Sequence, residues 1–150
     1  GHFREWDEKR EQDWNLLDFP AHQDFHRFMT DLNRFYLEHP AFFEKDYDAD
    51  GFQWLDCHSE ELCVYAFERA GKKERIVAVF NFSGAEQNGY QLEIPGAVKL
   101  ERIFCSELPA YGGKGGGEVK FLPDKSDSGK SVFEFTLLPF SAEYYMIKEI

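Results

Sequence analysis

The chain has 150 residues, of which 43% are hydrophobic and 17% aromatic, and this composition excludes an intrinsically disordered protein. Its formal net charge is −11, because 28 acidic residues oppose 17 basic ones. A surface of this sign repels phosphate backbones and anionic lipid, so we expect neither nucleic acid nor a membrane as a partner.

The first long element along the chain is a predicted helix. The residues before Asp18 are dense in charge without a sustained period, so we predict a loop there. Asp18 resembles a capping side chain, Pro20 suits the first helical turn, and Pro40 ends a helix placed over 20–38. Its apolar residues recur at spacings of three and four: Phe25, Phe28, Met29, Leu32, Phe35 and Tyr36. A stripe this aromatic must be buried against another surface.

After Pro40 the pattern changes from helical to strand-like. Residues 40–56 are predicted to form a connector, with a turn at Asp50-Gly51 and with Trp54 shortly before the first strand. Short segments with a period of two are predicted strands: 62–69, 74–83, 90–94, 98–104, 118–122, 131–138 and 143–149. Turn residues separate them: Gly71, Asn88-Gly89, Pro95-Gly96, 112–117, Ser128-Gly129 and Pro139. About seven strands with tight turns and no intervening helix are typical of an all-β sandwich.

The cysteines indicate a reducing compartment. Cys57, Cys63 and Cys105 are odd in number and lack C-x-x-C spacing, so neither a disulfide framework nor a structural zinc site is expected. We therefore expect a cytoplasmic location.

No motif in the sequence indicates a metal, a cofactor or a catalytic residue. His22 and His26 have the i, i+4 spacing of a helical metal pair but lack a nearby third ligand. The acidic residues at 46–51 lack the closing Glu of a calcium loop. The glycine-rich segment 112–117 fails the phosphate-loop pattern, and we predict a flexible hairpin loop there.

The tryptophans are the features that suggest binding. Trp6, Trp14 and Trp54 all lie in predicted loops, where a large ring is not automatically part of the core. A flat indole can stack on the apolar face of a pyranose ring, which makes these residues candidate carbohydrate contacts. The alternative is that each indole fixes its loop to the body of the protein.

The sequence closely resembles the carboxy-terminal region of bacterial 1,4-α-glucan branching enzymes, which belong to the α-amylase superfamily. The dense matches in the first 57 residues are Arg4-Glu5-Trp6, Asp13-Trp14, Leu16-Leu17, Arg27, Asp31-Leu32-Asn33, His39-Pro40-Ala41, Gly51-Phe52 and Trp54. Looser matches follow at Asn81-Phe82, Tyr111-Gly112-Gly113 and Leu138-Pro139.

The resemblance implies a division of labour within a longer protein. Family members carry a (β/α)8 barrel whose active site lies at the carboxyl ends of the strands, and a retaining mechanism there transfers α-1,4-glucan segments to form α-1,6 branches. The catalytic Asp, Glu and second Asp motifs of the family do not occur in this sequence. Residues 1–44 would be the end of that barrel, comprising the eighth strand–helix loop and the eighth helix. Residues 45–150 would be the carboxy-terminal antiparallel Greek-key β-sandwich.

The role that the resemblance implies is non-catalytic. The chain would stabilise the barrel and contact α-glucan, with the barrel of the same polypeptide as its partner. The alternative is a free-standing carbohydrate-binding module, although a self-sufficient module would not need a helix with an apolar stripe. In the isolated chain, we expect this stripe to be hidden in a homodimer or by folding of the helix onto the sandwich.

Overall fold

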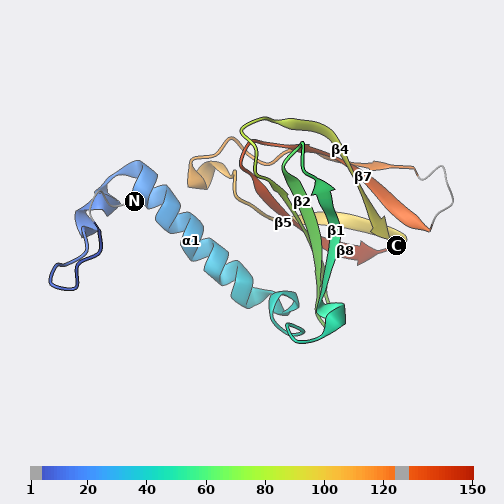
Figure 1. Cartoon of the computed structure of the whole chain (residues 1–150), viewed down its shortest axis with the longest axis horizontal. Coiled ribbons are helices and arrows are strands. Elements are labelled where there is room, and N and C mark those ends of the chain that lie inside the picture. The colour runs from blue at the N-terminus through green and yellow to red at the C-terminus, as the bar shows by residue number, and fades with distance from the viewer. Residues whose placement is uncertain (1–4, 124–128) are drawn as a thin grey trace.

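A computed structural model describes residues 5–123 and 129–150 of the chain. Arg4 of the branching-enzyme matches and Ser128 of a predicted turn lie outside the described residues. One long helix, α1 (Pro20–Glu38), precedes a sandwich of two antiparallel sheets (Figure 1). The predicted order of one helix followed by a mainly β sandwich is confirmed.

Helix α1 begins and ends at the predicted positions, but its cap differs from the prediction. A 3-10 turn, Trp14–Asp18, precedes it, and Pro20 occupies the first helical turn. The N-cap residue is Phe19 rather than Asp18, and no side chain caps the helix. Phe19 is extended because it precedes a proline, and His39 is extended before Pro40 for the same reason.

The larger sheet has five strands, in the order β1-β2-β3-β8-β5. Their bounds are β1 Phe52–Ser59, β2 Val64–Ala70, β3 Arg75–Asn81, β8 Ala142–Glu149 and β5 Val98–Cys105. The smaller sheet has the order β4-β7-β6, with bounds β4 Gln87–Pro95, β7 Lys130–Leu137 and β6 Val119–Leu122. Short 3-10 turns occur at Pro40–Phe42, Ala49–Gly51 and Pro109–Tyr111.

Strand β1 is an element that the sequence analysis missed. We predicted a connector through residue 56, whereas Phe52–Ser59 pairs with β2 as an edge strand. The pairing shifts register twice, between Trp54 and Asp56 and between Asp56 and Ser59. These irregularities break the period of two by which a strand is recognised in sequence. Trp54 therefore lies in a strand and not in a loop.

A second correction concerns Asn88-Gly89, which we predicted as a turn. Both residues lie inside β4, where the register shifts between Asn88 and Tyr90. Gly89 has φ +75°, a conformation that glycine adopts without the cost it carries for other residues. The Asn-Gly pair therefore marks a bulge within a strand and not the end of one.

The hydrophobic core fills the space between the two sheets. It is built from alternate residues of the inward faces: Val64, Ala66, Val77, Val79, Tyr90, Leu92, Ile94, Val98, Phe133, Phe135, Leu137, Tyr145 and Ile147. Helix α1 takes no part in this core and lies against the other face of the five-stranded sheet. Within the described ranges, no helix has the length and apolar character needed to cross a membrane.

Candidate functional site

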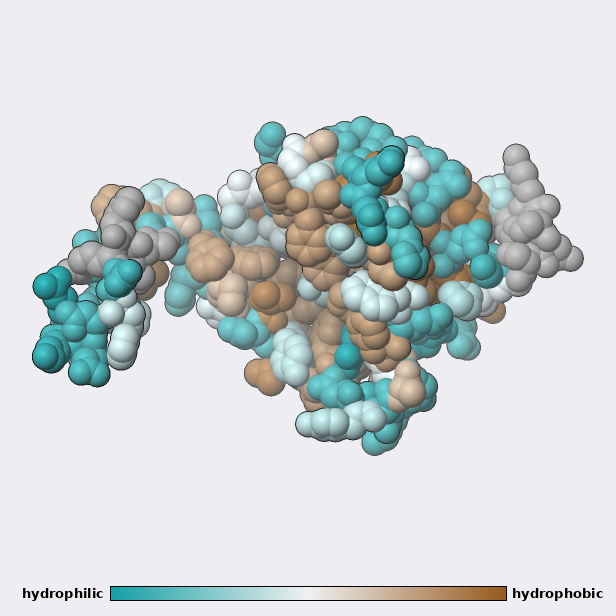
Figure 2. All heavy atoms as spheres, in the orientation of Figure 1, coloured by the Kyte–Doolittle hydropathy of each residue, from teal (hydrophilic) through white to brown (hydrophobic). Residues whose placement is uncertain are grey.

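The outer face of the five-stranded sheet, directed away from the core, carries a continuous set of aromatic rings. Successive rings have centroids between 5.2 and 5.9 Å apart. We call this the aromatic face, and it consists of Phe52, Trp54, Phe67, Phe80, Phe82, Phe104 and Tyr144. It extends from edge strand β1 across the sheet to β5, because alternate residues of each strand point to the same side. Figure 2 shows hydrophobic residues gathered over the middle of the molecule, where α1 meets the strands.

Trp54 lies at the β1 end of the aromatic face. Its indole is perpendicular to the rings of Phe52 and Phe67, with centroids 5.2 and 5.8 Å away. The residue nevertheless remains 50% exposed. Part of Trp54 therefore packs on the sheet, and the remainder faces solvent. Two fixed neighbours and a free surface are what a stacking platform for a sugar ring requires.

Trp6 and Trp14 lie far from Trp54. They are 77% and 69% exposed, in the segment that precedes α1. Trp54 follows the other end of this 19-residue helix, which spans about 28 Å. Figure 1 shows the N-terminal segment and β1 separated by the length of α1. The structure of this chain therefore does not bring the three tryptophans into one site.

The apolar stripe of α1 is divided between a packed and an exposed side. Phe35 is buried, and its ring stacks on Phe104 at 4.8 Å and meets Tyr144 at 5.2 Å. Phe28 meets Phe104 at 6.1 Å and Tyr111 at 5.4 Å. Phe25, in contrast, is 63% exposed. Met29 and Tyr36 are also exposed, so the expectation of a fully buried stripe is correct for only one side of the helix.

Polar contacts hold the connector after α1 against the β2–β3 hairpin. Arg69 donates to the carbonyl oxygens of Ala41 and Phe42, and Glu74 accepts from the backbone N–H of Ala41 at 2.9 Å. In the segment 46–51, Asp46 pairs with Arg69, and Asp50 pairs with Lys45 at 2.6 Å. In the parts of the chain that the structure describes, no three potential metal ligands gather into one site.

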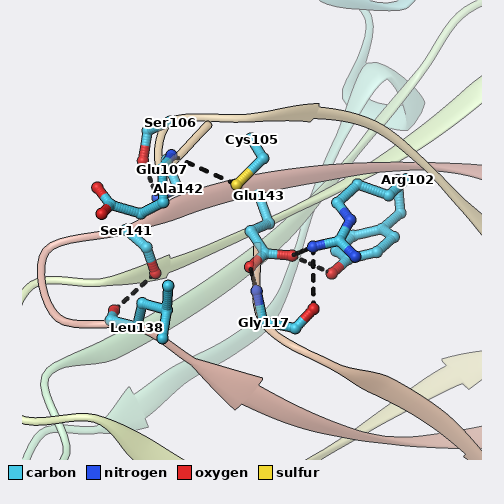
Figure 3. A network of polar contacts seen from close by, with 10 residues as sticks. Arg102, Cys105, Ser106, Glu107, Gly117, Leu138, Ser141, Ala142 and Glu143 are labelled. Atoms are coloured by element: carbon cyan, nitrogen blue, oxygen red, sulfur yellow. Dashed lines mark hydrogen bonds and ion pairs between the residues drawn. The ribbon is translucent and has the colours of Figure 1, made fainter. Parts of the chain in front are cut away.

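A buried carboxylate anchors the glycine-rich segment that we predicted to be flexible. Glu143 is fully buried and accepts hydrogen bonds from Gly117 N at 2.8 Å, from Arg102 Nη1 at 3.2 Å and from the Tyr145 hydroxyl (Figure 3). Arg102 Nη1 also donates to the Gly117 carbonyl oxygen at 2.9 Å. A Cβ at position 117 would lie 1.6 Å from Thr136 O, so only glycine fits there. The segment is thus pinned at its carboxyl end.

The environment of this network favours a structural role. Burial, together with the Glu143 carboxylate, raises the pKa of Tyr145 well above its usual value, and burial raises the pKa of Cys105. Sequence reasoning missed the network because its members are distant in the chain. One signal was available in the sequence. Glu143 is a charged residue at a position of the predicted strand 143–149 whose side chain points to the core, as those of Tyr145 and Ile147 do.

Comparison with known proteins places this geometry in a family. The family described as "Alpha amylase, C-terminal all-beta domain" matches residues 54–148. The chain is 37% identical over 125 residues to a 1,4-alpha-glucan branching enzyme of Marinobacter nauticus, covering 81% of the chain and 20% of the relative. It is 34% identical over 143 residues to one of Rhizobium meliloti, covering 93% and 19% respectively.

A solved structure shares the fold. The crystal structure of an alpha-amylase from H. orenii superposes with a TM-score of 0.51 and 16% identity, covering 81% of this chain and 20% of that one. At this identity the likeness concerns the fold alone. The chain spans about a fifth of the length of these branching-enzyme relatives, 20% of one and 19% of the other.

Proposed function

Since the chain belongs to the family of α-amylase C-terminal all-β domains, we propose that it is the non-catalytic carboxy-terminal region of a 1,4-α-glucan branching enzyme. In this proposal residues 1–44 are the end of the catalytic barrel and residues 45–150 are the sandwich domain. The observation that carries this proposal is the sequence similarity to the two branching enzymes, which match this chain over about a fifth of their own length. The three free cysteines are compatible with the cytoplasmic location that we propose for it.

The first function is to support the catalytic barrel. The side of α1 that carries Phe25 and Met29 is exposed, and so is the ring of Phe82 on the aromatic face. A contiguous apolar surface of this kind is characteristic of an interface. The barrel of the same polypeptide would cover both, because α1 is its last helix in this proposal. Edge strand β1 would stay free of that contact.

The second function is contact with α-glucan through Trp54. Its half-exposed indole offers a flat apolar surface at the margin of the aromatic face. Trp6 and Trp14, at the other end of α1, would contribute to the acceptor side of the active site in the complete enzyme. A free-standing carbohydrate-binding module would also explain Trp54, but it leaves the exposed side of α1 without a purpose.

The absence of catalysis by this chain alone is directly testable. A retaining glycoside transfer needs two carboxylates on either side of the scissile bond, and the catalytic motifs of the family are missing from the sequence. We expect the purified chain to leave the iodine colour of amylose unchanged. A loss of colour that persists after contaminating enzymes are excluded would contradict the proposal.

The role of Trp54 is tested by Trp54→Ala. Loss of a stacking contact should weaken binding of malto-oligosaccharide by about 1–2 kcal/mol. Tyr47→Ala is the matched control, because Tyr47 is a fully exposed aromatic in the connector outside the aromatic face. Affinity and melting temperature are measured together, in the chain and in the complete enzyme. Unchanged affinity with a lowered melting temperature would show that Trp54 only packs.

A further inference from the structure

An apolar pocket lies beside α1, on the outer face of the five-stranded sheet. Its volume is about 330 Å3, at the lower end of the range of binding clefts, and aromatic side chains make up most of its lining. Helix α1 forms one wall, and the end of β3 with the β7–β8 turn forms the other. We call it the α1 pocket, and the lining residues used below are Phe28, Leu32, Phe80, Phe82, Phe140 and Tyr144.

Phe140, in the β7–β8 turn, lines this pocket in an unfavourable state. Its side chain is 70% exposed, so the ring gains little from burial in this chain. Its backbone has φ +53°, in the left-handed region that a residue with a Cβ seldom adopts. Backbone strain of this kind persists only where the surrounding structure fixes it, and it is found most often at functional sites. Phe140 is therefore a candidate contact residue.

The turn that carries Phe140 is rigid. Phe140 N donates to Ser83 O at 3.0 Å. Ser141 Oγ donates to Leu138 O at 2.7 Å across the same turn. A Cβ added to Gly84 would lie 3.4 Å from the Phe140 ring, so the ring rests against the β3–β4 connection. A ring held in one position loses little conformational freedom on binding, which is the property of an interface anchor.

Phe82 is a second exposed ring of the pocket. It is 61% exposed, and its ring stacks on Phe80 with the centroids 5.7 Å apart and the ring planes 3° apart. Phe80 in turn meets Tyr144 at 5.8 Å, in the packed part of the aromatic face. Phe82 and Phe140 are thus two exposed rings with fixed neighbours on the same side of the pocket.

The position of the pocket indicates what fills it. A side chain in the pocket would contact Phe28 and Leu32 of α1 on one wall and the two exposed rings on the other. In the proposed function, α1 is the last helix of a (β/α)8 barrel, whose helices lie side by side in an outer ring. The branching-enzyme relatives are about five times as long as this chain, so the preceding polypeptide is long enough to supply such a neighbour. The lining carries no charged side chain, which suits an apolar residue.

We propose that Phe140 and Phe82 anchor the sandwich to the catalytic barrel of the same polypeptide, and that the barrel helix beside α1 inserts an apolar side chain into the α1 pocket. This rests on the proposed function, in which the barrel covers the exposed side of α1, and it names the residues through which the sandwich itself makes contact. The strain at Phe140 is then a cost in the isolated chain that burial offsets in the complete enzyme.

The experiment compares Phe140→Gly with Cys63→Gly, in the isolated chain and in the complete enzyme. Cys63 is the matched control because it is also exposed and also has a positive φ, +52°, but its side chain does not line the pocket. Both substitutions relieve backbone strain, and only Phe140→Gly removes a ring. The melting temperature is measured for the isolated chain at low protein concentration. In the complete enzyme, hydrogen exchange of the backbone amides at 83–86 measures opening of the contact.

We expect each substitution to raise the melting temperature of the isolated chain by about 2–4 °C. In the complete enzyme, Phe140→Gly should accelerate exchange at 83–86 by about tenfold or more, the effect of losing an interface anchor, whereas Cys63→Gly should leave this exchange unchanged. If the complete enzyme with Phe140→Gly fails to fold, Phe140→Leu replaces it and should accelerate exchange by a smaller factor.

Two results would overturn the anchor: a lowered melting temperature of the isolated Phe140→Gly chain, or unaltered exchange in the complete enzyme. The double substitution Phe25→Ser, Met29→Ser in the complete enzyme tests the proposed function separately. If it accelerates exchange at 83–86 while Phe140→Gly does not, the barrel contact stands and only the anchor fails. If neither change accelerates exchange, the barrel contact of the proposed function fails as well.

Discussion

Asn81 shows how one side chain holds several turns of the sandwich together. It is buried at the end of β3, and its Nδ2 donates to Ala85 O at 2.8 Å and to Leu138 O at 3.0 Å. Its Oδ1 accepts from Ser83 N at 2.9 Å. The amide therefore replaces backbone partners that the β3–β4 and β7–β8 connections would otherwise lack.

Replacing Asn81 should show that the β3–β4 and β7–β8 connections depend on its side-chain amide. Asn81→Ala leaves part-buried carbonyl and N–H groups without their partner, so we expect the free energy of unfolding to fall by about 1–3 kcal/mol. Urea denaturation monitored by tryptophan fluorescence measures it. Asn33→Ala, at an exposed position of α1, is the control and should change stability by less than about 0.5 kcal/mol. Equal effects of the two substitutions would contradict the assigned role.

Asp56 should make stability depend on pH in a defined direction. Burial by itself raises the pKa of Asp56, but hydrogen bonds from Ser59, His58 and Tyr90 outweigh burial and hold the pKa below its usual value. Because the pKa is lower in the folded than in the unfolded state, this stabilisation is complete above the unfolded pKa of about 3.9 and is lost as pH falls through the folded value.

Asp56→Asn is the variant that checks this direction. It should destabilise the chain near neutral pH, and the difference from the unaltered chain should shrink below about pH 4. Urea unfolding over a pH series measures both curves, with Asp18→Asn, at an exposed carboxylate, as control. A difference that stays constant down to the acid limit would rule out the hydrogen-bonded carboxylate as its cause.

At the scale of elements, α1 is attached to the sandwich mainly through Phe35. The centroid of this ring lies 4.8, 5.2, 5.2 and 4.7 Å from those of Phe104, Tyr144, Phe42 and His39, respectively. We expect Phe35→Ala to cost about 3 kcal/mol and to increase amide hydrogen exchange in α1. Leu37→Ala, on the exposed side of the same helix, should have little effect. Unaltered exchange in α1 of Phe35→Ala would mean that the helix is held by other contacts.

The elements differ in how well the sequence predicts them, and the reason is local regularity. The spacing of apolar residues between Pro20 and Pro40 fixes α1, and the strict alternation of Val64–Ala70 fixes β2. Strand β1 fails the same test because two register shifts interrupt it. Glu143 meets Arg102 and Gly117 only through the sheet topology, so no local pattern predicts that contact. The tryptophan candidates were found by residue type, and their separation by α1 became apparent only in the fold.

At the scale of the whole molecule, two opposing features govern association of the isolated chain. The exposed side of α1 and the exposed rings of Phe82 and Phe140 form apolar surface that favours burial against a partner. A net charge of −11 opposes the approach of a second copy. Packing of Phe28 and Phe35 on the sandwich buries part of the α1 stripe within one chain. This packing reduces the apolar surface that favours association but does not remove it.

We therefore predict a reversible homodimer whose population rises with ionic strength. Salt shortens the Debye length from about 30 Å at 0.01 M to about 8 Å at 0.15 M, so it screens charge repulsion while leaving apolar attraction in place. Multi-angle light scattering across this range should show the mean mass increasing from monomer toward dimer. The double substitution Phe25→Ser, Met29→Ser should keep the chain monomeric at both salt concentrations without lowering its stability, since both side chains are exposed.

A second double substitution changes the residues of the α1 stripe that pack on the sandwich. Phe28→Ser, Leu32→Ser removes the contacts of Phe28 with Phe104 and Tyr111, so it should lower the free energy of unfolding and release the amino-terminal part of α1 from the sandwich. A chain that stays monomeric at every salt concentration would refute the dimer. A chain whose stability is unaffected by Phe28→Ser, Leu32→Ser would refute packing of α1 on the sandwich. Because Phe25 and Met29 are exposed whereas Phe28 and Leu32 are partly buried, the effects of the two pairs of substitutions separate self-association from intramolecular packing.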